Sequence, residues 1–194
     1  PYISIFDGIK APFGKFSVMG NHDYGKYVHW NSTEAERKNV EKLRQHHASM
    51  GFDLLENDNR LIKKDGQSIR LLGVENWGNP PFPQYGDLDK SIENTKSDEF
   101  TILMSHDPDH WEEKTLKHEK KIHLTLAGHT HGSQFGIEIP GFKWSPVQYK
   151  YERWAGLYEK MGQYLYVNRG FGFLGYPGRV GIWPEITIIE LQSA

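Results

Sequence analysis

The sequence predicts an α/β fold, a layered sandwich of strands and helices. Apolar runs of strand length alternate with helical patterns along most of the chain, and a run of strands follows near its C-terminal end. The 194 residues suffice for one domain with a sizeable core and are too few for two. We therefore expect a single domain over residues 1–194.

The first predicted elements are a strand and a long helix. The strand is expected at residues 15–19, where apolar and polar residues alternate loosely and β-formers are frequent. The helix is expected over residues 31–51. Ser32 or Thr33 can cap its first turn, and Glu36 supplies the carboxylate of a capping box.

A hairpin, a short helix and a buried strand are expected next. Residues 60–76 read as two strands around Asp65 and Gly66, a pair typical of a two-residue hairpin turn. Asp87 can cap a short helix after a proline-rich loop. The apolar run at residues 100–105 predicts a buried strand.

The remaining elements are one helix and three strands. Asp107 and Pro108 predict a helix start, with the aspartate as N-cap and the proline at the first helical position. Residues 121–128 read as a strand that a glycine ends. In the aromatic, glycine-rich C-terminal part, strands are expected at residues 163–168 and 185–191.

The composition is that of an ordinary soluble globular protein, with 37% hydrophobic and 25% charged residues. A net charge of -2 without a basic run argues against a nucleic-acid partner. The absence of cysteine excludes disulfides and thiolate metal sites. No apolar run reaches the roughly 20 residues needed to cross a bilayer.

Three apolar runs close on histidine, in the stretches VMGNHD, ILMSHD and LTLAGHTHG. If these strands are neighbours in one sheet and run in one direction, their carboxyl ends form one rim. Neutral imidazole is a common ligand of Zn, Mn and Fe, and an amide oxygen can complete the set. The sequence therefore predicts a metal site at this rim, formed from Asn21, His22, His106, His129 and His131.

Each stretch also has a plainer interpretation. Asn21 and the glycine before it suit a simple turn, and a single histidine is usually a surface residue or a satisfied core residue. The repetition at three strand exits favours the metal site. In GHTH the i, i+2 spacing also lets both imidazoles point to one side of an extended segment.

The ordered set GNHD, SHD and GHTHG resembles the calcineurin-like metallophosphoesterase superfamily, and the likeness covers most of the chain. Residues 156–191, GLYEKMGQYLYVNRGFGFLGYPGRVGIWPEITIIEL, are similar to a bacterial subgroup that often carries an N-terminal membrane segment or export signal. The resemblance implies a four-layer α/β/β/α sandwich with a dinuclear metal centre at the strand exits. It also implies phosphoester hydrolysis by a bridging hydroxide.

The resemblance assigns roles to the motif residues. Asn21, His106 and His129 match ligands of one metal ion, and His131 matches a ligand of its partner. His22 resembles the histidine that contacts the substrate phosphate and can donate a proton to the leaving group. The complete protein is thus expected to hold two divalent ions, with Mn, Zn and Fe as candidates.

Two further residues receive weaker assignments. Asp23 is interpreted as a turn-forming residue that orients the loop of Asn21 and His22. Arg169 is a candidate for contact with an anionic substrate. Ser133 stands where the family commonly has glycine, which matters if the backbone there needs a positive φ.

The sequence departs from the family pattern at its N-terminal side. The family has Asp-x-His and Gly-Asp motifs before GNHD, and neither occurs upstream of Gly20. We therefore expect an N-terminally truncated domain from a longer protein, which is membrane-anchored or exported if the subgroup resemblance holds. The chain alone should bind at most one metal ion and have little or no activity. An open sheet edge or apolar face should favour self-association.

The predicted function is hydrolysis of a phosphodiester or pyrophosphate, on a phosphorylated small molecule or a lipid-like substrate. This preference comes from the subgroup resemblance alone. One alternative is a mononuclear metal hydrolase that uses Asn21, His106 and His129. The other is an inactive binding module that presents its aromatic residues to a ligand.

Overall fold

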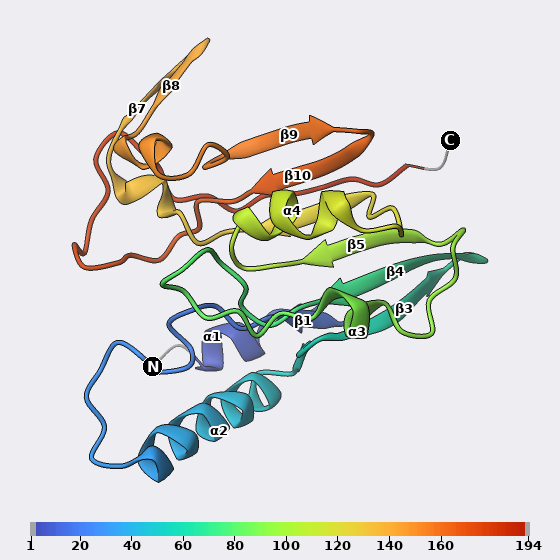
Figure 1. Cartoon of the computed structure of the whole chain (residues 1–194), viewed down its shortest axis with the longest axis horizontal. Helices are drawn as coiled ribbons and strands as arrows, with labels where there is room; N and C mark the ends of the chain where they lie inside the picture. The colour runs from blue at the N-terminus through green and yellow to red at the C-terminus, as the bar shows by residue number, and fades with distance from the viewer. Residues whose placement is uncertain (1–2, 193–194) are drawn as a thin grey trace.

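The computed structural model describes residues 3–192, and its centre is a six-stranded mixed sheet with the order β3-β4-β5-β6-β10-β9 (Figure 1). Neighbours from β4 to β10 run parallel, whereas β3 and β9 are antiparallel at the two edges. The strands are β3 (Asp58–Lys64), β4 (Gln67–Gly73), β5 (Phe100–Met104), β6 (Leu124–Ala127), β9 (Gly156–Lys160) and β10 (Gln163–Val167). The predicted α/β class is confirmed.

One face of this sheet is covered by the short helices α3 (Leu88–Ile92) and α4 (Asp109–Glu113), which lie in front of it in Figure 1. Leu88 of α3 packs on Leu72 and Leu103. Trp111 of α4 is fully buried against β10 residues of a second cluster. These contacts form the core on the helix side of the sheet.

The opposite face packs on a small parallel sheet of β1 (Lys15–Ser17) and β2 (Phe52–Leu54). Outside this pair lies α2 (Thr33–Ser49), which contacts β2 and also α1 (Ile3–Asp7). The layers therefore follow the expected α/β/β/α order, although within residues 3–192 only two strands form the second β layer. None of the helices in residues 3–192 has the length and hydropathy that a membrane span requires.

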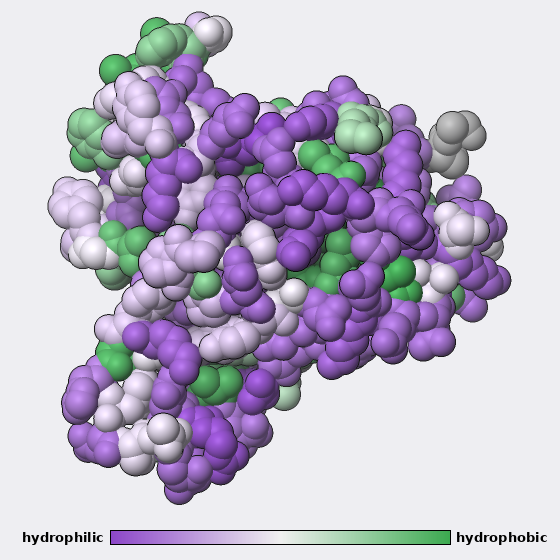
Figure 2. Space-filling model, in the orientation of Figure 1, coloured by the Kyte–Doolittle hydropathy of each residue, from purple (hydrophilic) through white to green (hydrophobic). Residues whose placement is uncertain are grey.

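A hairpin of β7 (Ile137–Ile139) and β8 (Phe142–Trp144) projects from the body of the molecule. Hydrophobic residues gather over its tip, at the upper left of Figure 2, where Ile139 and Phe142 are exposed. Short 3-10 helices occupy Thr115–Lys117, His131–Gln134 and Pro146–Tyr149. The second of them carries part of the GHTHG motif into the candidate site.

Two predictions based on local turn chemistry are confirmed, whereas the predicted start of α4 is wrong by one residue, because Pro108 and not Asp107 is its N-cap. Asp65 and Gly66 both have positive φ, 49° and 78°, as a two-residue hairpin turn between β3 and β4 requires. Asp87 caps α3 by accepting a hydrogen bond from the amide of Lys90 at 2.9 Å. Strand β5 lies within the predicted range 100–105, and its central residues are buried.

The predicted capping box of α2 is wrong in one respect. Ser32 is the N-cap and accepts a hydrogen bond from the amide of Ala35 at 3.1 Å. With the cap at Ser32, Glu36 lies one residue too far along the helix to bond back to the cap. It forms an ion pair with Lys26 at 2.7 Å instead.

The strand predicted at residues 185–191 is absent from the described structure, where this segment is extended but belongs to no sheet. Side chains hold it beside β10, with the Asn168 amide donating to Thr187 Oγ1 at 2.7 Å. Ile186 and Ile188 are 82% and 93% exposed. The alternating pattern predicted burial on one face, but nothing in the described chain lies over these side chains.

The same region exposes part of the sheet face that β1 and β2 do not reach. Leu157 and Tyr164 are 62% and 46% exposed, and with Leu124 they line an apolar groove of about 590 Å³ beside the C-terminal segment. The expected uncovered apolar face is therefore present. The helix side shown in Figure 2 is mostly hydrophilic by comparison.

Candidate metal centre

The three histidine-bearing loops meet at one cavity of about 610 Å³. Two of them follow β5 and β6, which are parallel neighbours, so their carboxyl ends lie side by side. The third loop follows β1, which belongs to the small sheet. The prediction that all three strands are neighbours in one sheet is therefore wrong for β1. The cavity is lined by all the predicted metal and catalytic residues: Asn21, His22, His106, His129 and His131.

Three of these side chains form a triangle of donor atoms. Asn21 Oδ1 lies 3.0 Å from His106 Nε2 and 3.1 Å from His129 Nδ1. The two ring nitrogens are 3.1 Å apart. Donors at about 2.1 Å from one ion lie about 3.0 Å apart on an octahedral edge and about 3.4 Å apart on a tetrahedral edge. The triangle therefore fits one face of an octahedral coordination sphere.

Both imidazoles of the triangle are held neutral. Burial lowers the pKa of His106 to about 4, and the charges of nearby His131 and His22 act in the same direction. Burial likewise lowers the pKa of His129 to about 3, assisted by the neighbouring His106. Since metal ions bind the neutral ring, both residues are ready to act as ligands at pH 7.

The Asn21 amide is oriented for the same role. This side chain is buried, and its Nδ2 donates to the hydroxyl of Tyr27 at 2.9 Å. Its Oδ1 consequently faces the two imidazoles. Within residues 3–192, no group of three or more His, Cys, Asp or Glu side chains is arranged to hold a metal ion, so the candidate set depends on this amide.

His131 and His22 line the same cavity but stand apart from the triangle. His131 is half-buried, and its Nδ1 has no hydrogen-bond partner in the described chain. Burial lowers its pKa, with the nearby Arg179 charge as the next cause. His22 is exposed, and its ring packs against the Tyr27 ring at a centroid distance of 4.5 Å. An exposed imidazole is accessible to a substrate.

The turn that carries Asn21 is shaped by Gly20 and Asp23. A Cβ at Gly20 would lie 2.6–2.8 Å from atoms of the His106 ring, so only glycine leaves room for that ring. Asp23 Oδ2 accepts a hydrogen bond from the Gly20 amide at 2.7 Å and closes the turn. This contact is of the kind expected for a residue that orients the loop.

The loop with His129 and His131 is held in left-handed backbone conformations, so the extended segment predicted for GHTH is wrong. His129, His131 and Ser133 have φ of 67°, 51° and 50°. Such a conformation costs about 1–2 kcal/mol for a residue with a Cβ, so Ser133 stands where glycine would be relaxed. Thr130 Oγ1 donates to the carbonyl of Trp154 at 2.7 Å and anchors the loop against this strain.

Several residues at the cavity were not predicted from the sequence. The Tyr151 hydroxyl lies 2.7 Å from His129 Nε2, on the ring edge opposite to the triangle. Lys150 lines the cavity, with its ammonium 4.7 Å from the centre of the Phe82 ring. Both come from the aromatic C-terminal part of the chain, and their spacing carries no motif.

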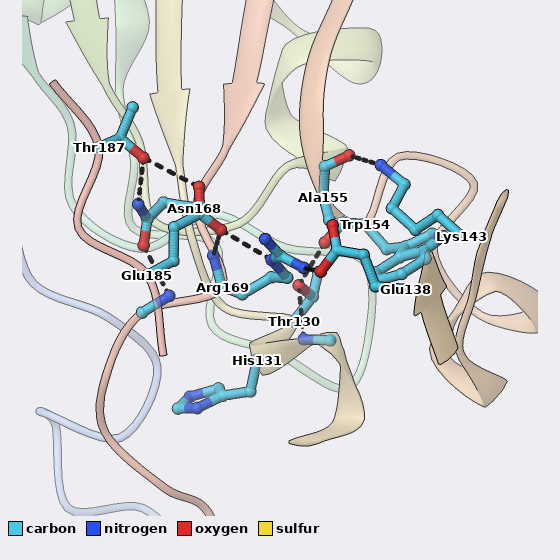
Figure 3. A network of polar contacts seen from close by, with 12 residues as sticks. Thr130, His131, Glu138, Lys143, Trp154, Ala155, Asn168, Arg169, Glu185 and Thr187 are labelled. Carbon is cyan, nitrogen blue, oxygen red and sulfur yellow. Dashed lines mark hydrogen bonds and ion pairs between the residues drawn. The ribbon is translucent and has the colours of Figure 1, made fainter. Parts of the chain in front are cut away.

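Arg169 is not brought to the cavity. Its guanidinium lies between the carboxylates of Glu185 and Glu138, with Nε 2.7 Å from Glu185 (Figure 3). The His131 ring extends away from this network. The predicted substrate contact is not supported, because the carboxylates of the half-buried Glu185 and the exposed Glu138 already hold the cation. Lys150 lines the cavity and makes no ion pair in the described chain.

Comparisons with known proteins point to phosphoesterases, as the candidate metal centre does. The family model for calcineurin-like phosphoesterases matches residues 3–133. The chain is 29% identical to the uncharacterized metallophosphoesterase YkuE of Bacillus subtilis (strain 168), over 98% of this chain and 60% of YkuE. It is 28% identical to phosphodiesterase YaeI of Escherichia coli (strain K12), over 97% of this chain and 63% of YaeI.

A transmembrane protein with a metallophosphoesterase domain from Bos taurus is 29% identical, over 96% of this chain and 40% of that protein. The chain thus spans less than two thirds of the length of these relatives. No solved structure matches it. With the motifs gathered at one cavity and the family model matching most of the sequence, the chain belongs to the calcineurin-like phosphoesterase family, whose members hydrolyse phosphoester bonds with divalent metal ions.

Proposed function

We propose that this protein hydrolyses phosphodiester or pyrophosphate bonds with the help of a dinuclear metal centre. The observation that carries the proposal is the triangle of Asn21 Oδ1, His106 Nε2 and His129 Nδ1 beside two further histidines in one cavity. The name of the relative YaeI, a phosphodiesterase, supports the choice of a diester.

The triangle would hold the first metal ion, and His131 would contribute to the second. Because a single imidazole cannot retain a divalent ion against water, the remaining ligands of the second ion must come from outside the described residues. Two bound divalent ions supply Lewis-acid activation of water and neutralise charge on the phosphoryl group. Manganese, zinc and iron all suit a set of imidazole and amide ligands.

His22 is the proposed proton donor. It lines the cavity without belonging to the triangle, and its exposed ring is accessible to the leaving group. An alkoxide leaving group needs a proton, and an imidazole beside the reacting phosphorus can supply one. Tyr27 packs against this ring and also holds the Asn21 amide. One tyrosine therefore positions both the proton donor and a metal ligand.

The rest of the cavity fits an anionic substrate with an apolar part. Lys150 lines the cavity and offers it a positive charge, although the carboxyl groups of Asp107 and Asp109 lie within electrostatic range of the ammonium. Phe82, Val147 and Leu174 supply an apolar wall. We propose a phosphorylated small molecule or a lipid-like phosphoester as the substrate class.

The test compares metal content and hydrolysis of an aryl phosphodiester in the longer protein. His129→Ala should lose metal and activity, whereas His46→Ala, a change in α2 away from the cavity, should keep both. Full metal content in His129→Ala would contradict the site. Absence of any chelator-sensitive turnover would favour the inactive binding module.

A mononuclear hydrolase is the second candidate. It is favoured by the three donors that the triangle offers one ion, and by His131 Nδ1, which contacts no hydrogen-bonding group of the described chain. Metal analysis separates the two candidates, since two ions per protein molecule exclude the mononuclear enzyme.

A further inference from the structure

We propose that Asp107 and Tyr151 are positioning residues that hold the His129 ring in one tautomer, with its proton on Nε2 and the lone pair of Nδ1 facing Asn21 and His106. The inference deepens the proposed metal site and does not depend on which phosphoester is the substrate. Tyr151 lines the cavity, but both residues approach His129 at Nε2, the ring nitrogen that is not part of the triangle.

The His129 ring has different neighbours on its two nitrogens. On one edge, Nδ1 faces the amide oxygen of Asn21 at 3.1 Å. On the other edge, Nε2 lies 2.7 Å from the Tyr151 hydroxyl and 3.4 Å from Asp107 Oδ2. A neutral imidazole carries one proton, so the surroundings of its two edges decide which nitrogen keeps it.

The acceptors around Nε2 favour the proton there. Asp107 is fully buried, and its Oδ2 has no hydrogen-bond partner in the described chain. A buried acceptor without a donor is costly, and a proton on His129 Nε2, 3.4 Å from this oxygen, supplies one. The Tyr151 hydroxyl can accept from the same N–H, so the two oxygens act together.

This arrangement leaves two acceptors facing each other across the triangle. With the proton on Nε2, the lone pair of Nδ1 points at the amide oxygen of Asn21, and neither atom can donate. A cation between them removes this repulsion. The tautomer thus prepares the triangle to receive a metal ion, as an outer carboxylate does for ligating histidines generally.

The position of Asp107 is fixed from several sides. Its Oδ1 accepts a hydrogen bond from the amide of Asp109 at 3.0 Å, at the start of α4. A Cβ at Gly78 would lie 2.4 Å from Oδ2, so glycine there makes room for the carboxylate. The Phe82 ring stands edge-on to His129 at a centroid distance of 4.9 Å and limits rotation of the imidazole.

The experiment reads the tautomer directly in the metal-free chain, by 15N-1H correlation of the histidine side chains. We expect His129 to carry its proton on Nε2 in the unaltered protein. Asp107→Asn combined with Tyr151→Phe should shift the proton toward Nδ1, where Asn21 Oδ1 can accept it. A proton on Nδ1 in the unaltered protein, or no change in the double variant, would overturn the proposal.

A second readout is the dissociation constant for Mn²⁺, titrated by calorimetry. Loss of such supporting contacts typically weakens metal binding by about 10–100-fold. The matched control is Asp109→Asn. Asp109 lies on the same turn as Asp107, and its carboxylate is hydrogen-bonded to Asn79 and not to His129. Tyr151→Phe alone serves if the double variant does not fold, because it removes one oxygen and keeps the ring. The tautomer is measured without metal or substrate. A failure of the proposed phosphoesterase function would therefore leave the measured position of the His129 proton unaffected.

Discussion

Replacement of Gly20 by alanine should disable the metal centre without touching a ligand. The new Cβ would lie 2.6 Å from the nearest atom of the His106 ring, whereas ordinary contacts begin at 3.4 Å. The ring must therefore move by about 0.8 Å, the difference between these distances. Metal-ligand distances tolerate about 0.2 Å, so His106 Nε2 would leave the triangle.

Two magnitudes follow from this displacement. Without His106 the triangle keeps one imidazole and one amide, and we expect metal binding to weaken about 100-fold or more. Overpacking should also destabilise the fold by about 1–3 kcal/mol, which lowers the melting temperature by about 2–12 °C in a protein of this size.

The assay is metal content by mass spectrometry together with thermal unfolding. The control is Gly172→Ala, because a Cβ there meets nothing within 4 Å and the backbone φ is not positive. Wild-type metal content in Gly20→Ala would refute the argument, since it would show that the His106 ring has another place to go without loss of coordination.

Three further predictions concern the proton donor, acid stability and the apolar face. His22→Ala should keep its metal but lose about 10²–10⁴-fold in turnover, less for nitrophenol leaving groups that need no proton; an equal loss with all leaving groups would exclude the acid role. Burial lowers the pKa values of His106, His110 and His129, so the unfolded chain binds protons there that the folded chain does not. The three imidazoles together outweigh Asp107, whose pKa burial raises to about 7 and which acts in the opposite direction. The free energy of unfolding of the metal-free protein should therefore fall by about 1 kcal/mol or more as the pH drops from about 6.5 toward 4, and urea unfolding at pH 7 and pH 4.5 that gave equal stability would contradict this. The exposed apolar face should make the 194-residue chain self-associate, and Leu157→Lys should weaken the association about tenfold or more in light scattering; a monomer at all concentrations would count against it.

Local chemistry explains which elements could be predicted from the sequence. The hairpin at Asp65 and the cap at Asp87 depend on a few neighbouring residues, and both are confirmed. The strand at residues 185–191 depends on a partner strand, which alternation alone does not supply, and the prediction is wrong. Helix α1 carries no cap or periodic pattern strong enough to be recognised in advance.

The candidate site divides in the same way. Residues within motifs, such as Asn21 and His129, were found because each motif marks a strand exit, and the structure gathers them at one cavity. Tyr151 was missed because it reaches His129 only through the fold. Arg169 was placed wrongly because a sequence does not reveal that Glu185 and Glu138 neutralise it.

The donor triangle joins two layers of the fold. Asn21 follows β1 of the small sheet, whereas His106 and His129 follow strands of the large sheet. An ion held by all three side chains would therefore be a cross-link between the layers, and its binding energy would be added to the cohesion of the sandwich. Loss of the metal in a cell would then shorten the lifetime of the folded protein as well as abolish its activity. The amount of folded protein would thus depend on the supply of the ion.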